Sequence, residues 1–128
     1  MAVKRLVEAV DSIQQDRSAH FLFRDYAIAH NEYALSAFED GVVNTYRIDR
    51  TFVDDEGVRW VVDYKSTDTN RADLAAFVDE QVQLRHRPQL EKYGALMHEI
   101  DARPIKLAVY FPLLRQLRVW DYSDSVRH

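Results

Sequence analysis

Two acidic residues and a lysine near the middle of the chain have the types and spacing of a site for a hard metal cation. Asp49 lies in one largely apolar segment, and Asp63 and Lys65 lie two positions apart in the next. Carboxylates and a backbone carbonyl supply the oxygen ligands that Mg²⁺ prefers, while water fills its other positions. In an extended strand Lys65 shares a face with Asp63, so its ammonium group can orient or polarise a metal-bound water.

The loop between the two segments predicts that the carboxylates face each other. A three-residue hairpin loop that ends in Gly57 would place this glycine at the left-handed position of the turn. Asp54 would then close against Val58, and counting back from this closure places Asp49 opposite Asp63. A loop one residue shorter or longer would put the two aspartates on opposite faces of the sheet.

One face of this predicted hairpin is apolar and the other carries charges. The apolar face would hold Tyr46, Ile48, Phe52, Trp60, Val62 and Tyr64, with Arg50 as an exception. The charged face would hold Arg47, Asp49, Thr51, Val61, Asp63 and Lys65, with Arg47 opposite Lys65. Like charges directly opposite each other destabilise a sheet by up to about 1 kcal/mol. A solvated outer face, on which basic residues offset the acids, therefore stays open as an alternative to a cation site.

The elements that must position these residues follow from hydrophobic periodicity and turn residues. Strands are expected at 20–23, 32–38, 45–53, 58–65, 105–111 and 117–122, with a turn at 39–41. Helices are expected at 3–15 and from an N-cap at Asn70 to about residue 86. Pro88 either begins a further helix or kinks one long helix. This order predicts an α/β domain in which a mixed β-sheet is flanked by helices.

Length and composition set the outer limits. The 128 residues suit one domain, residues 1–128, and the 47% apolar and 30% charged residues are typical of a globular protein. No apolar run approaches the roughly 20 residues of a membrane helix, and no membrane partner is expected. Acidic residues near the N-terminus are unlike a signal peptide, so we expect a cytoplasmic protein. The net charge of −4 argues mildly against a nucleic-acid partner, because phosphate binding usually needs a basic surface.

Four motifs in fixed order resemble a known family. They are Ile48-Asp49-Arg50-Thr51-Phe52, Trp60-Val61-Val62-Asp63-Tyr64-Lys65, Arg87-Pro88-Gln89-Leu90-Glu91-Lys92-Tyr93 and Tyr110-Phe111-Pro112-Leu113. From about residue 32 to 122 the chain is similar to the C-terminal nuclease domain of the RecB and AddA group of helicase–nucleases, within the PD-(D/E)xK superfamily. The resemblance implies a restriction-endonuclease-like core (α-β-β-β-α-β). It also implies Mg²⁺- or Mn²⁺-dependent hydrolysis of DNA, with an exonuclease role in repair or recombination. A helicase or further nuclease subunit would be the partner.

Carried over residue by residue, the resemblance also implies roles for individual side chains. Asp49, Asp63 and the main-chain carbonyl of Tyr64 would bind the metal, and Lys65 would position the attacking water. Gln89 and Tyr93, one helical turn apart, would hold substrate or order the acidic strand, although core packing with Leu90 and Leu96 also explains Tyr93. Substrate phosphates would contact Arg85 and Arg87, and Glu32 is a further candidate acid.

The chain departs from the family pattern in two respects. Family members usually carry a metal-binding histidine on a helix upstream of the first aspartate, but the predicted helix 3–15 has none, and His20 and His30 lie outside it. No helicase motor accompanies the nuclease motifs. These departures leave an alternative open: a catalytically inactive nuclease fold that binds DNA or docks a protein.

Overall fold

A five-stranded mixed sheet is the centre of the fold, which a computed structural model describes for residues 16–123. Its strands are β1 (Ala29–Glu39), β2 (Val42–Val53), β3 (Arg59–Tyr64), β4 (Ile105–Phe111) and β5 (Gln116–Asp121), in that spatial order. Neighbouring strands are antiparallel except β3 and β4, which are parallel. The parallel pair requires a long crossover, and the helices between β3 and β4 provide it. This arrangement confirms the predicted α/β class.

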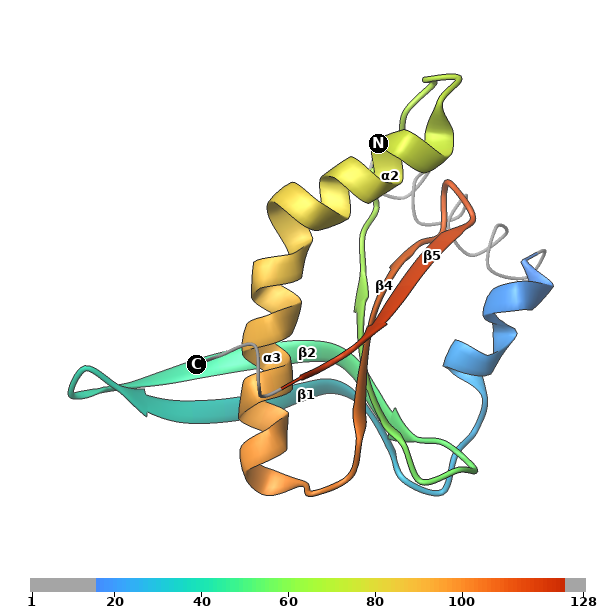
Figure 1. The fold of residues 1–128 in the computed structure, drawn as a ribbon. Coiled ribbons are helices and arrows are strands. Elements are labelled where there is room, and N and C mark those ends of the chain that lie inside the picture. The colour runs from blue at the N-terminus through green and yellow to red at the C-terminus, as the bar shows by residue number, and fades with distance from the viewer. Residues whose placement is uncertain (1–15, 124–128) are drawn as a thin grey trace.

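Both faces of the central strands are covered (Figure 1). On the helix face, α2 (Leu74–Gln81), the π-helical turn η2 (Val82–His86) and α3 (Arg87–Ile100) pack against the sheet. On the opposite face, which we call the η1 face, the 3₁₀ helix η1 (Arg17–Phe23) packs against the sheet. The alternative of a solvated outer face is therefore wrong for β3, since Val61 is fully buried on the helix face and Asp63 is only 5% exposed. A solvated face does not explain Asp63.

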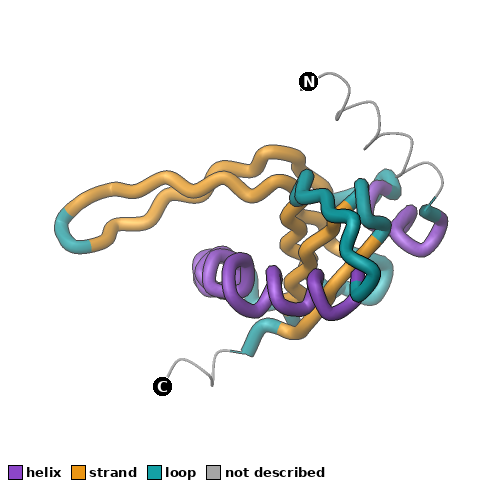
Figure 2. The backbone as a smooth tube through the Cα atoms, turned by 90° about the horizontal axis from the view of Figure 1, so that it is seen from above, coloured by secondary structure: helices purple, strands orange, loops and turns teal. Residues whose placement is uncertain are grey.

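Beyond the central strands, β1 and β2 continue alone as a two-stranded arm, which Figure 2 shows projecting from the rest of the sheet. Asp40 and Gly41 join the strands with positive φ values of 51° and 79°, as a two-residue turn of type I′ requires. An ion pair between Glu39 and Lys92 fixes the arm to α3. The exposed tip carries Phe38, of which 77% is accessible.

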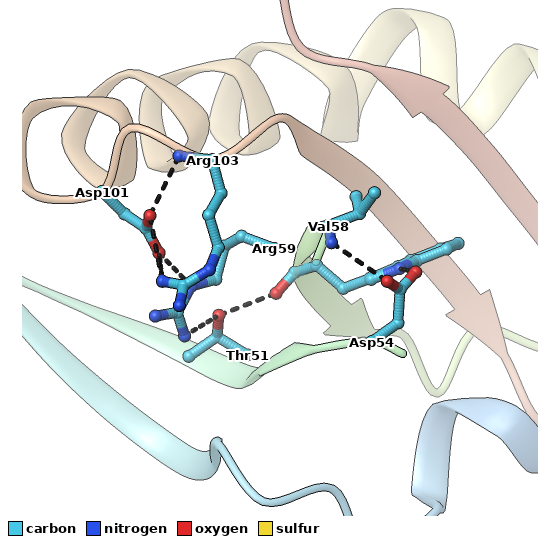
Figure 3. Close-up of polar contacts among 7 residues, drawn as sticks. Thr51, Asp54, Val58, Arg59, Asp101 and Arg103 are labelled. Atoms are coloured by element: carbon cyan, nitrogen blue, oxygen red, sulfur yellow. Dashed lines mark hydrogen bonds and ion pairs between the residues drawn. The ribbon is translucent and has the colours of Figure 1, made fainter. Parts of the chain in front are cut away.

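The hairpin between β2 and β3 has the predicted loop. Gly57 has a φ of 80°, and the Asp54 N–H donates to the Val58 carbonyl oxygen over 2.9 Å. Figure 3 shows the carboxylate of Asp54 inside this turn, where it accepts hydrogen bonds from the Val58 N–H and, at 2.8 Å, from the indole of Trp60. Thr51 donates to the Trp60 carbonyl oxygen at 2.7 Å. These local bonds lock the register of the hairpin.

The helices between β3 and β4 follow one another without a break, and we call them together the helical rod. The helix type changes from α to π in the turn before Pro88. Pro88 lies in the first turn of α3, directly after the π-helical turn η2. Because proline has no N–H, it cannot donate to the carbonyl four residues earlier, and the helix accommodates this loss by a wider turn. Pro88 thus marks the expected boundary, although the helix does not stop there.

Three local predictions need correction or fall outside the description. The predicted strand at 20–23 is part of η1, because Ala19 and Leu22, three residues apart, are both buried against the sheet. The first long helix has its N-cap position at Asp73 rather than Asn70, and ahead of it the Arg71 N–H donates to Thr69 Oγ1. The predicted helix at 3–15 lies outside the described residues. Within residues 16–123, no helix has the length and apolar character to cross a membrane.

Candidate active site

The sheet forks at the predicted site. The last paired residues of β2 and β3 are Arg50 and Val62, and beyond them β2 stays with β1 while β3 stays with β4. Continuing the same register by one position places Asp49 opposite Asp63, as predicted. At the fork the Tyr64 N–H donates to Asp49 Oδ2 over 2.8 Å. The side-chain carboxylate of Asp49 thus accepts this N–H, in place of a main-chain carbonyl of β2.

The two carboxyl groups lie within hydrogen-bonding distance of each other. Asp63 is buried, whereas Asp49 is half-buried. Burial raises the pKa of Asp63 to about 6, with a further contribution from the Asp49 carboxylate and an opposing one from Lys65. Asp63 therefore keeps its proton to a higher pH than an ordinary carboxylic acid, and a bound cation would displace this proton.

Lys65 connects this acid pair to α3. Its Nζ lies 2.8 Å from Asp63 Oδ2 and donates to Gln89 Oε1 over 3.4 Å. Gln89 in turn donates through Nε2 to the Tyr93 hydroxyl oxygen at 2.9 Å. The structure therefore brings together the five predicted residues Asp49, Asp63, Lys65, Gln89 and Tyr93. Asp63 Oδ2 is buried, and apart from its ion pair with Lys65 it accepts no hydrogen bond of regular geometry within residues 16–123.

Glu32 lies on β1 beside the site and lines a pocket together with Asp49. It stands across from Asp49, between the pairs Asn31–Arg50 and Tyr33–Ile48, and its φ is 50°. At this point β2 changes faces: Ile48 packs on the helix face and Phe52 on the η1 face, although residues four apart share one face of a regular strand. Left-handed backbone in a non-glycine residue is strained and recurs at functional sites. Beside this distortion, Glu32 and Asp49 line one pocket.

That pocket has a volume of about 500 Å³ and lies beside the fork. Its walls come from η1, β1, β2 and β3, and they comprise Phe23, Asn31, Glu32, Asp49, Arg50 and Tyr64. Because the pocket includes Asp49 and Tyr64, it adjoins the acid pair directly.

Other predicted residues lie away from this centre. Arg87 is placed over the Trp120 ring, 5.0 Å from its centroid, and near Glu91, on a different side of α3 from Gln89. Arg85 is exposed on η2. His30 is exposed on β1 and pairs with Thr51 in the sheet register. Arg47 does not pair with Lys65, because the two strands have already separated.

Sequence reasoning missed the role of Arg50. Its guanidinium is only 8% exposed and donates to the carbonyl oxygens of Leu22 and Arg24 and to Asn31 Oδ1 at 2.6, 2.8 and 2.9 Å. Arg50 thereby ties η1 and β1 to the strand that carries Asp49. In the sequence, the one indication of this role was that Arg50 is the charged exception on the predicted apolar face of the hairpin. Another polar group that could not be anticipated from the sequence is the Nε2 atom of His86, which is buried without a hydrogen bond among the described residues.

The donor set fits a divalent cation with few protein ligands. Among residues 16–123, no group of three or more histidines, cysteines or acids is close enough to hold a metal together. The fork instead offers the Asp49 and Asp63 carboxylates and main-chain oxygens of β3. Mg²⁺ binds in this manner, through one or two carboxylates and several waters. The burial of the Asp63 carboxyl and its raised pKa both fit a site that a bound cation would stabilise.

Among the comparisons with known proteins, the match to a family model agrees with this chemistry. The family model described as the PD-(D/E)XK nuclease superfamily matches residues 2–122. No curated protein matches the chain. Among solved structures, the chain is similar to that of SSO0001 at 16% sequence identity and a TM-score of 0.48, over 88% of this chain and 52% of that one. The chain thus spans about half the length of SSO0001.

Proposed function

Because this chain belongs to the PD-(D/E)XK nuclease superfamily, we propose that it hydrolyses DNA phosphodiester bonds with Asp49, Asp63 and Lys65 as its reacting groups. The observation that carries the proposal is the acid pair at the sheet fork, with the ammonium group of Lys65 2.8 Å from Asp63. A superfamily of nucleases that typically use divalent metals supplies the reaction class. The geometry of the fork supports the choice of these three residues.

Each residue has a distinct task. Asp49 and Asp63 would hold the cation, with the Tyr64 carbonyl as a third oxygen ligand. A bound Mg²⁺ or Mn²⁺ supplies a water of lowered pKa and positive charge for the phosphate. Lys65, held between Asp63 and Gln89, would orient the attacking water. In the reaction the attacking water would lose a proton to solvent and its oxygen would form the new bond to phosphorus, while the bridging P–O bond breaks and the leaving oxygen takes a proton from solvent.

Gln89 and Tyr93 act as positioning residues. The Tyr93 hydroxyl accepts the Gln89 amide N–H, and burial raises the pKa of Tyr93, which keeps it neutral. Gln89 can therefore present its carbonyl oxygen to Lys65 in a fixed orientation. This link from α3 to the Asp-x-Lys strand supports the finer assignment to the RecB and AddA group.

We extend the proposal to an exonuclease that acts in DNA repair or recombination with a helicase or further nuclease subunit, in the cytoplasm. The support is the order of the motifs around Asp49, Asp63 and Gln89, together with the net charge of −4. An acidic domain has little counterion-release affinity of its own for DNA. A partner that binds DNA would supply it.

A second candidate function is a catalytically inactive DNA-binding or protein-docking module. It is favoured by one observation: the described residues contain no third histidine or acid close enough to ligate the same ion. The two candidates differ in whether a cation at the fork produces cleavage.

A cleavage assay separates the two candidates. Purified protein is incubated with end-labelled single- and double-stranded DNA in chelator, Mg²⁺ or Mn²⁺. We expect cleavage only with the cations and its loss in Lys65→Ala, by at least about a hundredfold. Lys106→Ala is the matched control, because Lys106 also pairs with an aspartate, Asp121, but away from the fork. Intact DNA under all conditions would favour the inactive module, and full activity of Lys65→Ala would refute its assigned role.

A further inference from the structure

The pocket beside Asp49 has features that metal-dependent hydrolysis alone does not require. Its volume of about 500 Å³ lies within the range of roughly 300–1,000 Å³ that holds small organic ligands. Two ligands of a metal, Asp49 and the Tyr64 carbonyl, need no cavity lined by η1. The pocket instead combines an aromatic wall with a buried cation.

The aromatic wall consists of Phe23 and Tyr64. Their rings stack with centroids 5.6 Å apart and planes 23° from parallel. Phe23 remains 36% exposed, although the hydrophobic effect favours covering so large an apolar ring. A planar ring exposed in a pocket beside Asp49 provides a surface on which a nucleobase can stack.

The buried cation is Arg50. All three of its described hydrogen-bond acceptors are uncharged: the Leu22 and Arg24 carbonyls and the side-chain oxygen of Asn31. No ion pair joins Arg50 to an acid within residues 16–123. A guanidinium has five N–H donors, so two remain beyond these three bonds.

A buried positive charge without a carboxylate partner is costly in a protein interior. An anionic group that enters the pocket would offset this cost. Asn31 adds donors of its own, because Arg50 occupies its oxygen and leaves the amide N–H groups for another acceptor. The pocket therefore suits a phosphate next to a flat ring.

We propose that this pocket binds one unpaired nucleotide adjoining the scissile phosphodiester, with its base on Phe23 and its phosphate near Arg50 and Asn31. The inference rests on the proposed nuclease function and adds its substrate class. A base in a duplex is paired and stacked, and must leave the helix before it can enter a pocket. Single strands and frayed ends are therefore the preferred substrates. Glu32, exposed and lining the same pocket, would offer a hydrogen-bond acceptor to the edge of the base.

The first test removes the ring of Phe23 while keeping apolar volume. Phe23→Leu should raise KM for single-stranded DNA by roughly 5- to 150-fold, which corresponds to the stacking of one base. Phe23→Tyr should restore the parent value. Phe38→Leu is the matched control, since Phe38 is an exposed phenylalanine at the tip of the arm. An unchanged KM for Phe23→Leu, or an equal loss in Phe38→Leu, would overturn the proposal.

The second test locates the base and does not depend on cleavage. Single-stranded oligonucleotides with 2-aminopurine at successive positions are titrated with the protein in Ca²⁺, and the fluorescence change reports stacking at each position. We expect one responsive position next to the cut, and loss of that response in Phe23→Leu. Replacing that nucleotide by an abasic one should weaken parent binding but leave Phe23→Leu binding unaffected.

The outcomes separate this inference from the proposed function. A parent protein that responds at one position but never cuts would contradict the nuclease function and support the pocket. A parent that cuts DNA and shows no position-specific response, or the same response as Phe23→Leu, would overturn the pocket. Melting temperatures of all variants establish that each is folded.

Discussion

Asp63→Asn removes a charge that the fold buries beside a second carboxyl group. In the absence of metal, the parent protein must either ionise Asp63 next to Asp49 or retain a proton there. Its pKa in the folded protein is about 6, against an ordinary value of 3.8. Asparagine has nearly the same shape and carries no charge at any pH. We therefore expect the variant to be more stable than the parent at neutral and alkaline pH.

The magnitude follows from the shift of the pKa. A shift of about two units corresponds to about 3 kcal/mol, and the burial of Asp63 means that solvent screening reduces it little. Because the folded-state pKa is the higher one, this stability is present below about pH 4 and is lost as the pH rises through 6. For a chain of this length, about 3 kcal/mol corresponds to a melting shift on the order of 10 °C.

The assay is a thermal melt of parent and Asp63→Asn at pH 4 and pH 8, in chelator and in millimolar Mn²⁺. In chelator, the variant should melt higher at pH 8 and close to the parent at pH 4. A cation at a hundredfold excess over its Kd should stabilise the parent by about 2.7 kcal/mol and leave the variant unchanged. Asp121→Asn is the matched control, because Asp121 is an exposed acid paired with a lysine.

Two results would refute this reasoning. If Asp63→Asn is no more stable than the parent at pH 8 in chelator, the carboxyl pair does not destabilise the metal-free fold. If Mn²⁺ raises the melting temperature of parent and variant equally, the cation binds elsewhere.

Two further predictions concern the residues that position the site. Gly57→Ala should lower the free energy of unfolding by about 1–2 kcal/mol, measured in urea, because Gly57 has a φ of 80° and open space around it. Gly57→Asn should lose less, and an alanine variant as stable as the parent would contradict the turn. Gln89→Ala should lower kcat about tenfold with little change in KM, since Gln89 holds Lys65 and a hydrogen bond to a charged group is worth about 1.5–3 kcal/mol. Gln83→Ala, an exposed change on the same helical rod, should leave kcat at the parent value, and an equal kcat for both variants would exclude the positioning role.

The register of the hairpin could be predicted because its determinants are local. Gly57 must adopt positive φ, and this single requirement sets the loop length and thus which residues face each other. The structure adds Asp54, whose carboxylate accepts the turn N–H groups and the Trp60 indole. Asp49 and Asp63 therefore meet as expected without reference to any relative.

The environment of the site could not be predicted because it depends on distant segments. Whether the face of Asp63 is solvated or buried is decided by the helical rod, which lies after it in the chain. The change of face between Ile48 and Phe52 coincides with the left-handed backbone of Glu32 on the neighbouring strand. Strand periodicity, which assumes strict alternation, contains no signal for it.

Charged residues on helices were similarly hard to place. Arg87 and Gln89 are two positions apart, and successive residues of a helix are rotated by about 100°, so only one of them can face the fork. The structure places Gln89 there and sets Arg87 on Trp120. Helical geometry alone shows that Arg87 and Gln89 cannot both face the fork. Which of the two faces it depends on how the helical rod packs against the sheet.

The central claim is that the fork between β2 and β3 holds a divalent cation between Asp49 and Asp63. The most direct measurement is anomalous diffraction from crystals of the parent protein soaked in Mn²⁺, with Asp63→Asn crystals as the control. We predict an anomalous peak within coordination distance of both carboxylates, accompanied by movement of Lys65 Nζ away from Asp63, and no peak in the variant. A peak at another place, or none at a concentration that saturates Mn²⁺ binding in solution, would contradict the assignment.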